Sequence, residues 1–182
     1  MSLYLVFAMG APGGGADGLS LPGAALAPAL WVGQRLSGRP GAPPPGAPRH
    51  LLLSDSIAKA DPAGDTEIWR WSGRQILPGE EPAPAGAGGL LVNWMNIDAA
   101  HEDEFNAWYD TEHAPRFRAV DGVLAARRFR SDAGQPHYAA VYHLRNLDVV
   151  QSAAWRAAAA TPWSARILTF RYDNLRMGFT PA

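Results

Sequence analysis

Glu112 and His113 are the adjacent pair of residues in this sequence best suited to proton transfer. They lie near the end of a run whose apolar residues recur at helical spacing, Glu104-Phe-Asn-Ala-Trp-Tyr-Asp-Thr-Glu-His-Ala-Pro115. At 100° per residue, Glu112 falls near the middle of the apolar stripe. A desolvated carboxylate has a raised pKa, which suits a general acid or base, and a histidine beside a pocket titrates near neutrality. The pair therefore predicts proton transfer at the end of a helix.

Both residues also have purely structural interpretations. Arg116 follows Glu112 by four residues and lies on the same predicted stripe, as does Ala119, so an ion pair could neutralise the carboxylate. His113 could instead cap the last carbonyls of the helix. The helix is expected to end near His113, because Pro115 lacks an N–H and would clash with an earlier carbonyl.

Other aromatic and polar residues are candidates for binding a substrate. They come from the same helix and from three expected strands: Trp108, Tyr109, Tyr142, His143, Arg127 and Asn93. His143 shares a strand face with alanine and valine, which is typical of a buried structural histidine. The seven tryptophans favour either an ordinary core or a cavity lined by aromatic rings.

The second half of the chain predicts a ferredoxin-like β-α-β-β-α-β unit, which places the fold in the α+β class. The first strand is residues 90–97, and a helix capped by Asp98 follows it. Residues 123–130 and 137–144 predict a hairpin. A second helix capped by Asn146 or Asp148 ends at Thr161-Pro162, and the last strand covers 167–176.

The first half reads as a degraded copy of the same unit. Residues 3–9 predict a strand, 24–36 a short helix, and 50–58 and 66–72 a hairpin about 70 residues before the later one. We expect a degraded half at 1–77, a Pro/Gly linker at 78–89 and a complete half at 90–182. The two halves could pair as a barrel within one chain. Alternatively, the two predicted hairpins are similar only because the same turn residues recur in most hairpins, without an internal duplication.

The run ending at Pro115 resembles the EthD-like pattern E-F-N-x-W-Y-x-x-E-H-x-P of the dimeric α+β barrel superfamily. Asp121-Gly122 stands where that family has Pro-Gly, and an arginine-containing strand follows. The resemblance covers about residues 90–176. It implies a ferredoxin-like unit that pairs with a second copy. It also implies binding of small apolar, often aromatic molecules, as in monooxygenases, isomerases, polyketide cyclases and haem-degrading enzymes.

Composition narrows the remaining possibilities. A net charge of −1 over 182 residues argues against nucleic-acid or membrane-surface binding. There are no cysteines, no apolar run of membrane-spanning length and no leader-like start, so a cytoplasmic protein is expected. The chain has no H-E-x-x-H, phosphate-binding loop or dinucleotide fingerprint, so neither a metal nor a nucleotide cofactor is predicted.

These observations predict a cofactor-independent enzyme of the monooxygenase, isomerase or cyclase type. Its substrate would be a small apolar, aromatic or polyketide-like compound. Two alternatives stay open: a non-catalytic ligand-binding or scaffold protein, and a haem-linked enzyme with His113 or His143 as axial ligand. A homo-oligomer is expected if only the second half forms a sheet.

Overall fold

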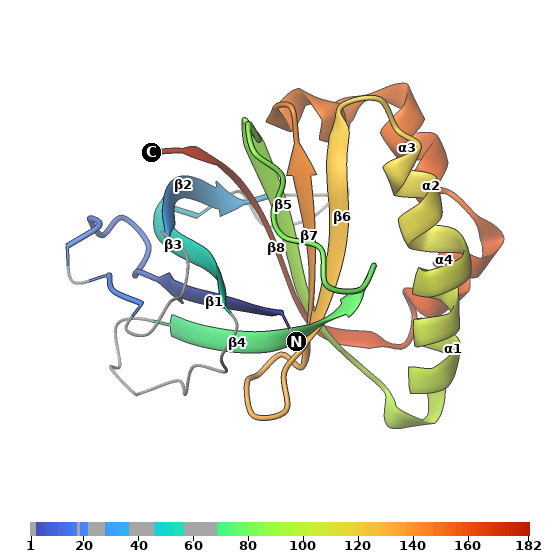
Figure 1. Ribbon diagram of the computed structural model, residues 1–182. Helices are drawn as coiled ribbons and strands as arrows, with labels where there is room; N and C mark the ends of the chain where they lie inside the picture. The colour runs from blue at the N-terminus through green and yellow to red at the C-terminus, as the bar shows by residue number, and fades with distance from the viewer. Residues whose placement is uncertain (1–2, 18, 22–27, 37–45, 57–68) are drawn as a thin grey trace.

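The computed structural model describes residues 3–17, 19–21, 28–36, 46–56 and 69–182, and their strands form one closed antiparallel barrel (Figure 1). The strands are β1 (Tyr4–Met9), β2 (Ala29–Arg35), β3 (Arg49–Ser56), β4 (Trp69–Leu77), β5 (Gly89–Ile97), β6 (Val123–Arg130), β7 (Tyr138–Leu144) and β8 (Arg171–Pro181). Their order around the barrel is β1-β3-β2-β8-β5-β7-β6-β4, and β4 closes on β1.

Both halves of the chain arrange their strands in the same order. The first half gives β4-β1-β3-β2 and the second gives β8-β5-β7-β6, which is fourth-first-third-second in each. The halves join through β2 with β8 and through β4 with β6. An α+β fold with a degraded repeat that completes the barrel within one chain is therefore confirmed.

Two details predicted for the first half are wrong. Residues 29–35 form strand β2 and not the end of a helix, because Trp31 packs into the barrel while Leu30 points outward, the alternation of a strand. Strands β3 and β4 are not a hairpin, since β1 lies between them; the hairpin pair is β2 and β3. Residues 24–27 and the expected turn at 61–65 lie outside the described residues.

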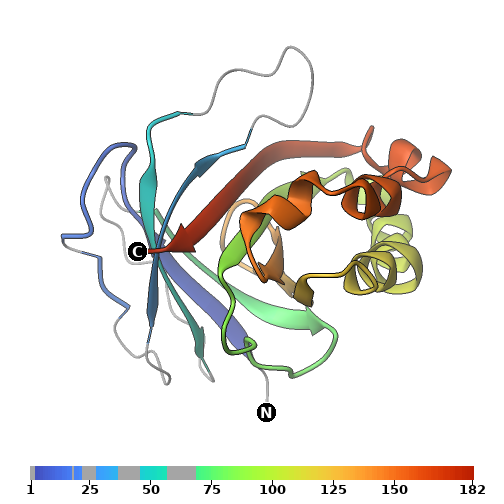
Figure 2. The ribbon, with the colours of Figure 1, turned by 90° about the horizontal axis from the view of Figure 1, so that it is seen from above.

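The helices that the described residues form all belong to the second half and cover the outer face of its sheet (Figures 1 and 2). They are η1 (Ala99–His101), α1 (Glu102–Trp108), the π-helical turn η2 (Tyr109–His113), α2 (Ala114–Arg118), η3 (Leu147–Gln151), α3 (Ala153–Ala159) and α4 (Pro162–Ile167). Asp98 caps η1 as predicted, whereas Asn146 caps the short η3 and Ser152 caps α3, the helix with the alanine run. The helix with the alanine run, α3, ends before Thr161-Pro162 as predicted, but Thr161 then begins a further helix, α4, so the last strand starts at Arg171 and not at 167.

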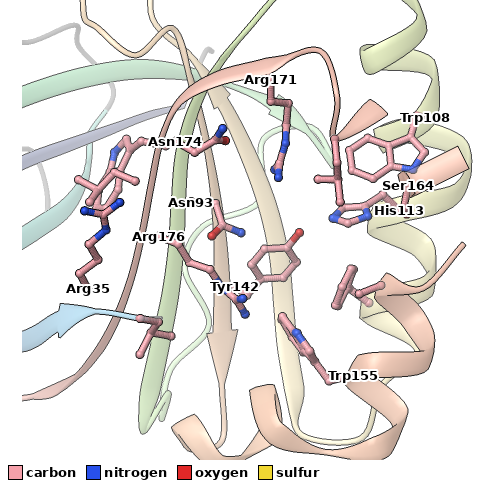
Figure 3. A pocket seen from close by; sticks show the side chains of 16 residues that line it. Arg35, Asn93, Trp108, His113, Tyr142, Trp155, Ser164, Arg171, Asn174 and Arg176 are labelled. Atoms are coloured by element: carbon pink, nitrogen blue, oxygen red, sulfur yellow. The ribbon is translucent and has the colours of Figure 1, made fainter. Parts of the chain in front are cut away.

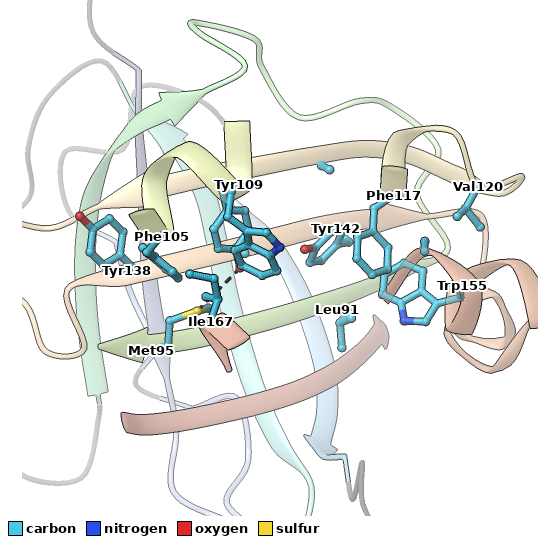
Figure 4. Close-up of a cluster of buried hydrophobic side chains, with 14 of the residues drawn as sticks. Leu91, Met95, Phe105, Tyr109, Phe117, Val120, Tyr138, Tyr142, Trp155 and Ile167 are labelled. Atoms are coloured by element: carbon cyan, nitrogen blue, oxygen red, sulfur yellow. Dashed lines mark hydrogen bonds between the residues drawn. The ribbon is translucent and has the colours of Figure 1, made fainter. Parts of the chain in front are cut away.

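The sheet separates two cores. Between the sheet and the helices lies a helix-side core that includes Leu91, Met95, Phe105, Phe117 and Trp155 (Figure 4). Inside the barrel lies a second core that includes Phe7, Trp71, Trp94, Phe129 and Phe179. Side chains that alternate along β5 to β8 therefore point either into the filled barrel or toward the helices, where the candidate site lies.

Gly33 is required at the seam between the two halves. It pairs with Phe179 across β2 and β8, and a Cβ there would clash with the Gly178 carbonyl and the Phe179 ring. We expect Gly33→Ala to lower the free energy of unfolding by about 1–3 kcal/mol, because close-packed backbone cannot absorb an added carbon. Gly46→Ala is the matched control, since a Cβ at Gly46 meets nothing within 4 Å. Equal urea midpoints for both variants would contradict this account.

Candidate functional site

A π-helical turn positions Glu112 and His113. The Ala114 N–H donates to the carbonyl of Tyr109, five residues back, so this turn is wider than an α-helical turn. Pro115 then begins α2, and the helical segment continues to Arg118 instead of ending near His113. The wide turn avoids the predicted clash between the Pro115 ring and the carbonyl four residues before it.

The extra residue in this turn moves the buried face along by one position. Phe117 and Val120 are buried, whereas the predicted core positions Arg116 and Ala119 are exposed. The ring of His113, itself half-buried, consequently packs against Trp108 and Phe117 on this face. Glu112 lies at the edge and is half-buried. π-Turns of this kind often occur at functional sites, where they redirect a side chain.

A pocket of about 550 Å³ lies between the outer face of the sheet and the helices (Figure 3). Helical residues form one side of it, and strands β5, β7 and β8, with the end of β2, form the other. The lining residues are Arg35, Leu36, Asn93, Trp94, Trp108, His113, Phe117, Tyr142, Trp155, Ala159, Ser164, Leu168, Arg171, Asn174, Leu175 and Arg176. The structure therefore brings four predicted site residues together: Asn93, Trp108, His113 and Tyr142.

The helical side of the pocket is aromatic. The His113 ring lies 3.9 Å from the Trp108 ring and 4.6 Å from the Phe117 ring, measured between centroids. Its Nδ1 is buried and has no hydrogen-bond partner among the described residues, and the same holds for Nε1 of Trp108. Burial, reinforced by the charges of Arg171 and Arg128, lowers the pKa of His113 to about 3. At neutral pH the site therefore presents an uncharged imidazole.

The lowered pKa of His113 makes stability depend on pH. Between about pH 6.5 and 3 the unfolded chain protonates this histidine while the folded chain keeps it neutral, so stability falls as the pH falls. We expect His113→Phe, which keeps a stacked ring, to lose less stability than wild type on acidification from pH 7 to 4. The difference should reach at most about 1.4 kcal/mol per pH unit. Parallel urea-midpoint curves for the two proteins would contradict the assignment.

A chain of hydroxyl groups connects the pocket to Glu112. Thr161 Oγ1 lies 2.6 Å from Glu112 Oε1 and 2.8 Å from Ser164 Oγ, and it accepts the Ser164 backbone N–H at 2.9 Å. An ionised carboxylate only accepts, and a hydroxyl has one proton, so Thr161 donates to Glu112 and the Ser164 hydroxyl donates to Thr161. The lone pairs of Ser164 Oγ are then free to accept a proton from the pocket that Ser164 lines.

Neither structural interpretation of the Glu112–His113 pair describes what the structure shows. Arg116 donates to the carbonyls of Ala157 and Ala158 on α3, and the described residues show no ion pair between Arg116 and Glu112. His113 stacks on aromatic rings and does not cap a carbonyl. Glu112 itself does not line the pocket and reaches it only through Thr161 and Ser164.

The sheet side of the pocket is polar and cationic. Asn93 and Arg176 are register partners on β5 and β8, and Arg171 and Asn174 precede Arg176 on β8. Burial raises the pKa of Tyr142 well above its ordinary value, so its phenol stays neutral and can donate a hydrogen bond. Sequence reasoning missed Arg171, Asn174 and Arg176, because their pocket-facing positions depend on the register of β8 against β5.

Three other predicted binding residues are not in the pocket. Tyr109 is buried behind it, where its hydroxyl donates to Met95 Sδ at 3.7 Å (Figure 4). Arg127 and His143 point into the barrel, on the opposite face of the sheet. Burial first, and then the charge of Arg127, lowers the pKa of His143 to about 3. Arg127 pairs with Asp55 on β3 at 2.7 Å, so it joins the two halves of the chain.

The described ranges show neither a metal-binding cluster nor a membrane span. They contain no group of three His, Cys, Asp or Glu side chains placed to hold a metal ion. None of their helices has the length and apolar character that a membrane crossing requires.

Comparison with known proteins identifies the fold. No family model matches the sequence, and no similar sequence is found among curated proteins. A proposed monooxygenase from Fusobacterium nucleatum matches at a TM-score of 0.57 and 6% identity, over 99% of this chain and 92% of that one. A Listeria monocytogenes ferredoxin-fold protein related to antibiotic biosynthesis monooxygenases matches at 0.55 and 10%, over 100% and 96%.

A third solved structure, of dimeric chlorite dismutases from Nitrobacter winogradskyi, matches at a TM-score of 0.50 and 12% identity, over 97% of this chain and 99% of that one. At these identities the likeness shows the fold alone. The chain therefore shares the ferredoxin-like barrel fold of these proteins, with both halves of the barrel supplied by one polypeptide.

Proposed function

We propose that this chain is a small-molecule enzyme that removes a proton from an aromatic or polyketide-like compound without a cofactor. The observation that carries the proposal is the hydroxyl chain from Ser164, on the pocket wall, through Thr161 to Glu112. A proton taken by Ser164 Oγ displaces its own proton to Thr161 and that of Thr161 to Glu112. The half-buried carboxylate can then exchange the proton with solvent.

The aromatic wall suits a flat ligand. Rings stack favourably on Trp108, Phe117 and Trp155, and Asn93 and Tyr142 can hydrogen-bond a carbonyl or hydroxyl group. In the proposal His113 is an uncharged hydrogen-bonding group on the pocket wall, and Glu112 is the proton acceptor. Deprotonation beside a carbonyl or on a phenol is the first step of isomerase, cyclase and cofactor-independent monooxygenase reactions alike.

We also propose that the chain is related to EthD-like proteins and that it divides into halves at residues 1–77 and 90–182. We further propose that it is cytoplasmic and forms a homo-oligomer. The helical run ending at Pro115 supports the EthD relationship, and the β4 and β5 boundaries at Leu77 and Gly89 support the division. A homo-oligomer is supported by the dimeric Nitrobacter neighbour. Sedimentation velocity of the whole chain tests the oligomer directly.

A thermal-shift screen with small aromatic and polyketide-like compounds tests the pocket. A ligand at a hundredfold excess over its Kd adds about 2.7 kcal/mol to stability. We expect binders whose shift is lost in His113→Ala and retained in His101→Ala, whose ring stacks on Phe170 and does not line the pocket. Binding without any turnover would instead support a non-catalytic ligand-binding or scaffold protein.

Haem titration of the same variants separates the haem-linked alternative. His143 points into the filled barrel beside Arg127, which leaves His113 as the histidine on the pocket wall. Because Nδ1 of His113 is buried, Nε2 is the ring nitrogen that would have to serve as an axial ligand. A Soret band in wild type that disappears in His113→Ala would replace the cofactor-independent proposal.

A further inference from the structure

Arg176 is a cation on the pocket wall that the described part of the chain does not neutralise. It makes no ion pair with a described residue, and its Nε is buried without a hydrogen-bond partner there. Burial lowers its pKa. Arg176 as a whole is half-buried, and a buried N–H without an acceptor is costly, so its Nε is suited to an acceptor from outside the described structure.

The other charged side chains that line the pocket are also cations. Arg171 and Arg35 also line it, and none of the lining residues that the structure describes is Asp or Glu. The charge of Arg171 contributes to the lowered pKa of His113, so the cationic side of the pocket acts across to the aromatic side. Figure 3 shows Arg176, Asn93 and Asn174 opposite Trp108 and His113.

We infer that the ligand of this pocket is an aromatic anion whose carboxylate binds Arg176 while its ring system stacks against Trp108, His113 and Trp155. The inference rests on the proposed function and names its substrate class. A guanidinium presents parallel N–H donors that match the two oxygens of a carboxylate, and such paired, charge-assisted bonds are the strongest available at this site. Asn93, the register partner of Arg176, adds a neutral donor beside it.

This orientation also places the reacting part of the ligand. With the carboxylate held on β8, the ring system extends across the pocket toward the helical side, where Ser164 and His113 lie (Figure 3). The anionic group therefore anchors the ligand, and the proton that Ser164 removes belongs to the opposite end of the molecule.

Binding of 2-naphthoate and of its neutral analogue 2-naphthamide, followed by tryptophan fluorescence and calorimetry, tests the inference. We expect the wild-type chain to bind the carboxylate about tenfold to a hundredfold more tightly than the amide. Arg176→Gln should lose most of that preference, and Arg176→Lys should keep part of it. Arg145→Gln, an exposed arginine outside the pocket, should keep all of it.

Equal affinities in wild type, no binding of either compound, or a preference that survives Arg176→Gln would each overturn the inference. The proposed function fails by a different result, because its hydroxyl chain does not include Arg176. If the protein prefers the carboxylate but no proton is transferred through Thr161, the proposed function is wrong and the inferred ligand class is supported. If the protein transfers protons from neutral compounds and shows no preference for the carboxylate, the proposed function is supported and the inferred ligand class is wrong.

Discussion

Replacing Asp55 by alanine is expected to lower the free energy of unfolding by about 3–5 kcal/mol. The Asp55 side chain, 4% exposed, accepts from Arg127 Nη2 at 2.7 Å and from the Ala83 N–H at 2.6 Å, and the Arg127 side chain is fully buried. Removing the carboxylate leaves a buried guanidinium held mainly by Gln75 Oε1. Urea unfolding measures the loss, and the thermal midpoint should fall by about 10 °C.

The exposed pair Arg145–Asp121, at 3.0 Å, provides the matched control. Asp121→Ala should leave the urea midpoint nearly unchanged, because an ion pair in water contributes little. The double variant Asp55→Leu with Arg127→Met should recover most of the lost stability, since neither partner then remains as an isolated buried charge. A loss in Asp55→Ala no larger than that in Asp121→Ala would show that the pair does not hold the two halves together.

Thr161→Val is expected to slow turnover of a bound substrate by about 10²–10⁴-fold while leaving its Kd within about twofold. Valine has the shape of threonine but cannot pass a proton from Ser164 to Glu112. Because Thr161 also caps α4, this variant should lose about 1 kcal/mol of stability, so activity is measured well below its unfolding temperature.

Two further variants separate the hydroxyl chain from the helix cap. Thr161→Ser keeps both the cap and the proton path, so it should retain most activity. Glu112→Gln keeps a hydrogen-bond acceptor beside Thr161 but cannot take up the proton, so it should be as slow as Thr161→Val. A Glu112→Gln enzyme as active as wild type would remove Glu112 from the mechanism.

The second half of the fold could be predicted because its local signals agree with one another. The Asp98 cap, the apolar strand before it and the turn at Asp121-Gly122 each specify one boundary independently. The first half was harder, since the alanine-rich segment before β2 has helical propensity, whereas Trp31 is buried only by pairing with distant strands. Tertiary contacts override local propensity in such a segment.

The candidate site was predictable only in part, for a geometric reason. Regular helical spacing places Glu112 near the middle of the buried face, but with one extra residue in the π-turn it is the His113 ring that packs against Trp108 and Phe117. The partners on the other elements depend on the register of β8 and on the new helix begun by Thr161. No local pattern marks Ser164 or Arg176 as pocket residues, because each reaches the pocket through contacts far away in the sequence.

Solvent exchange into a bound ligand tests the central claim most directly. Compounds that shift the melting temperature are incubated in D₂O with wild type, Thr161→Val or Thr161→Ser, and deuterium at carbon is followed by NMR. We expect incorporation into at least one binder with wild type and Thr161→Ser, and a rate at least a hundredfold lower with Thr161→Val. Binders that exchange no faster with wild type than in buffer, or equally fast with Thr161→Val, would contradict proton transfer from this pocket to Glu112.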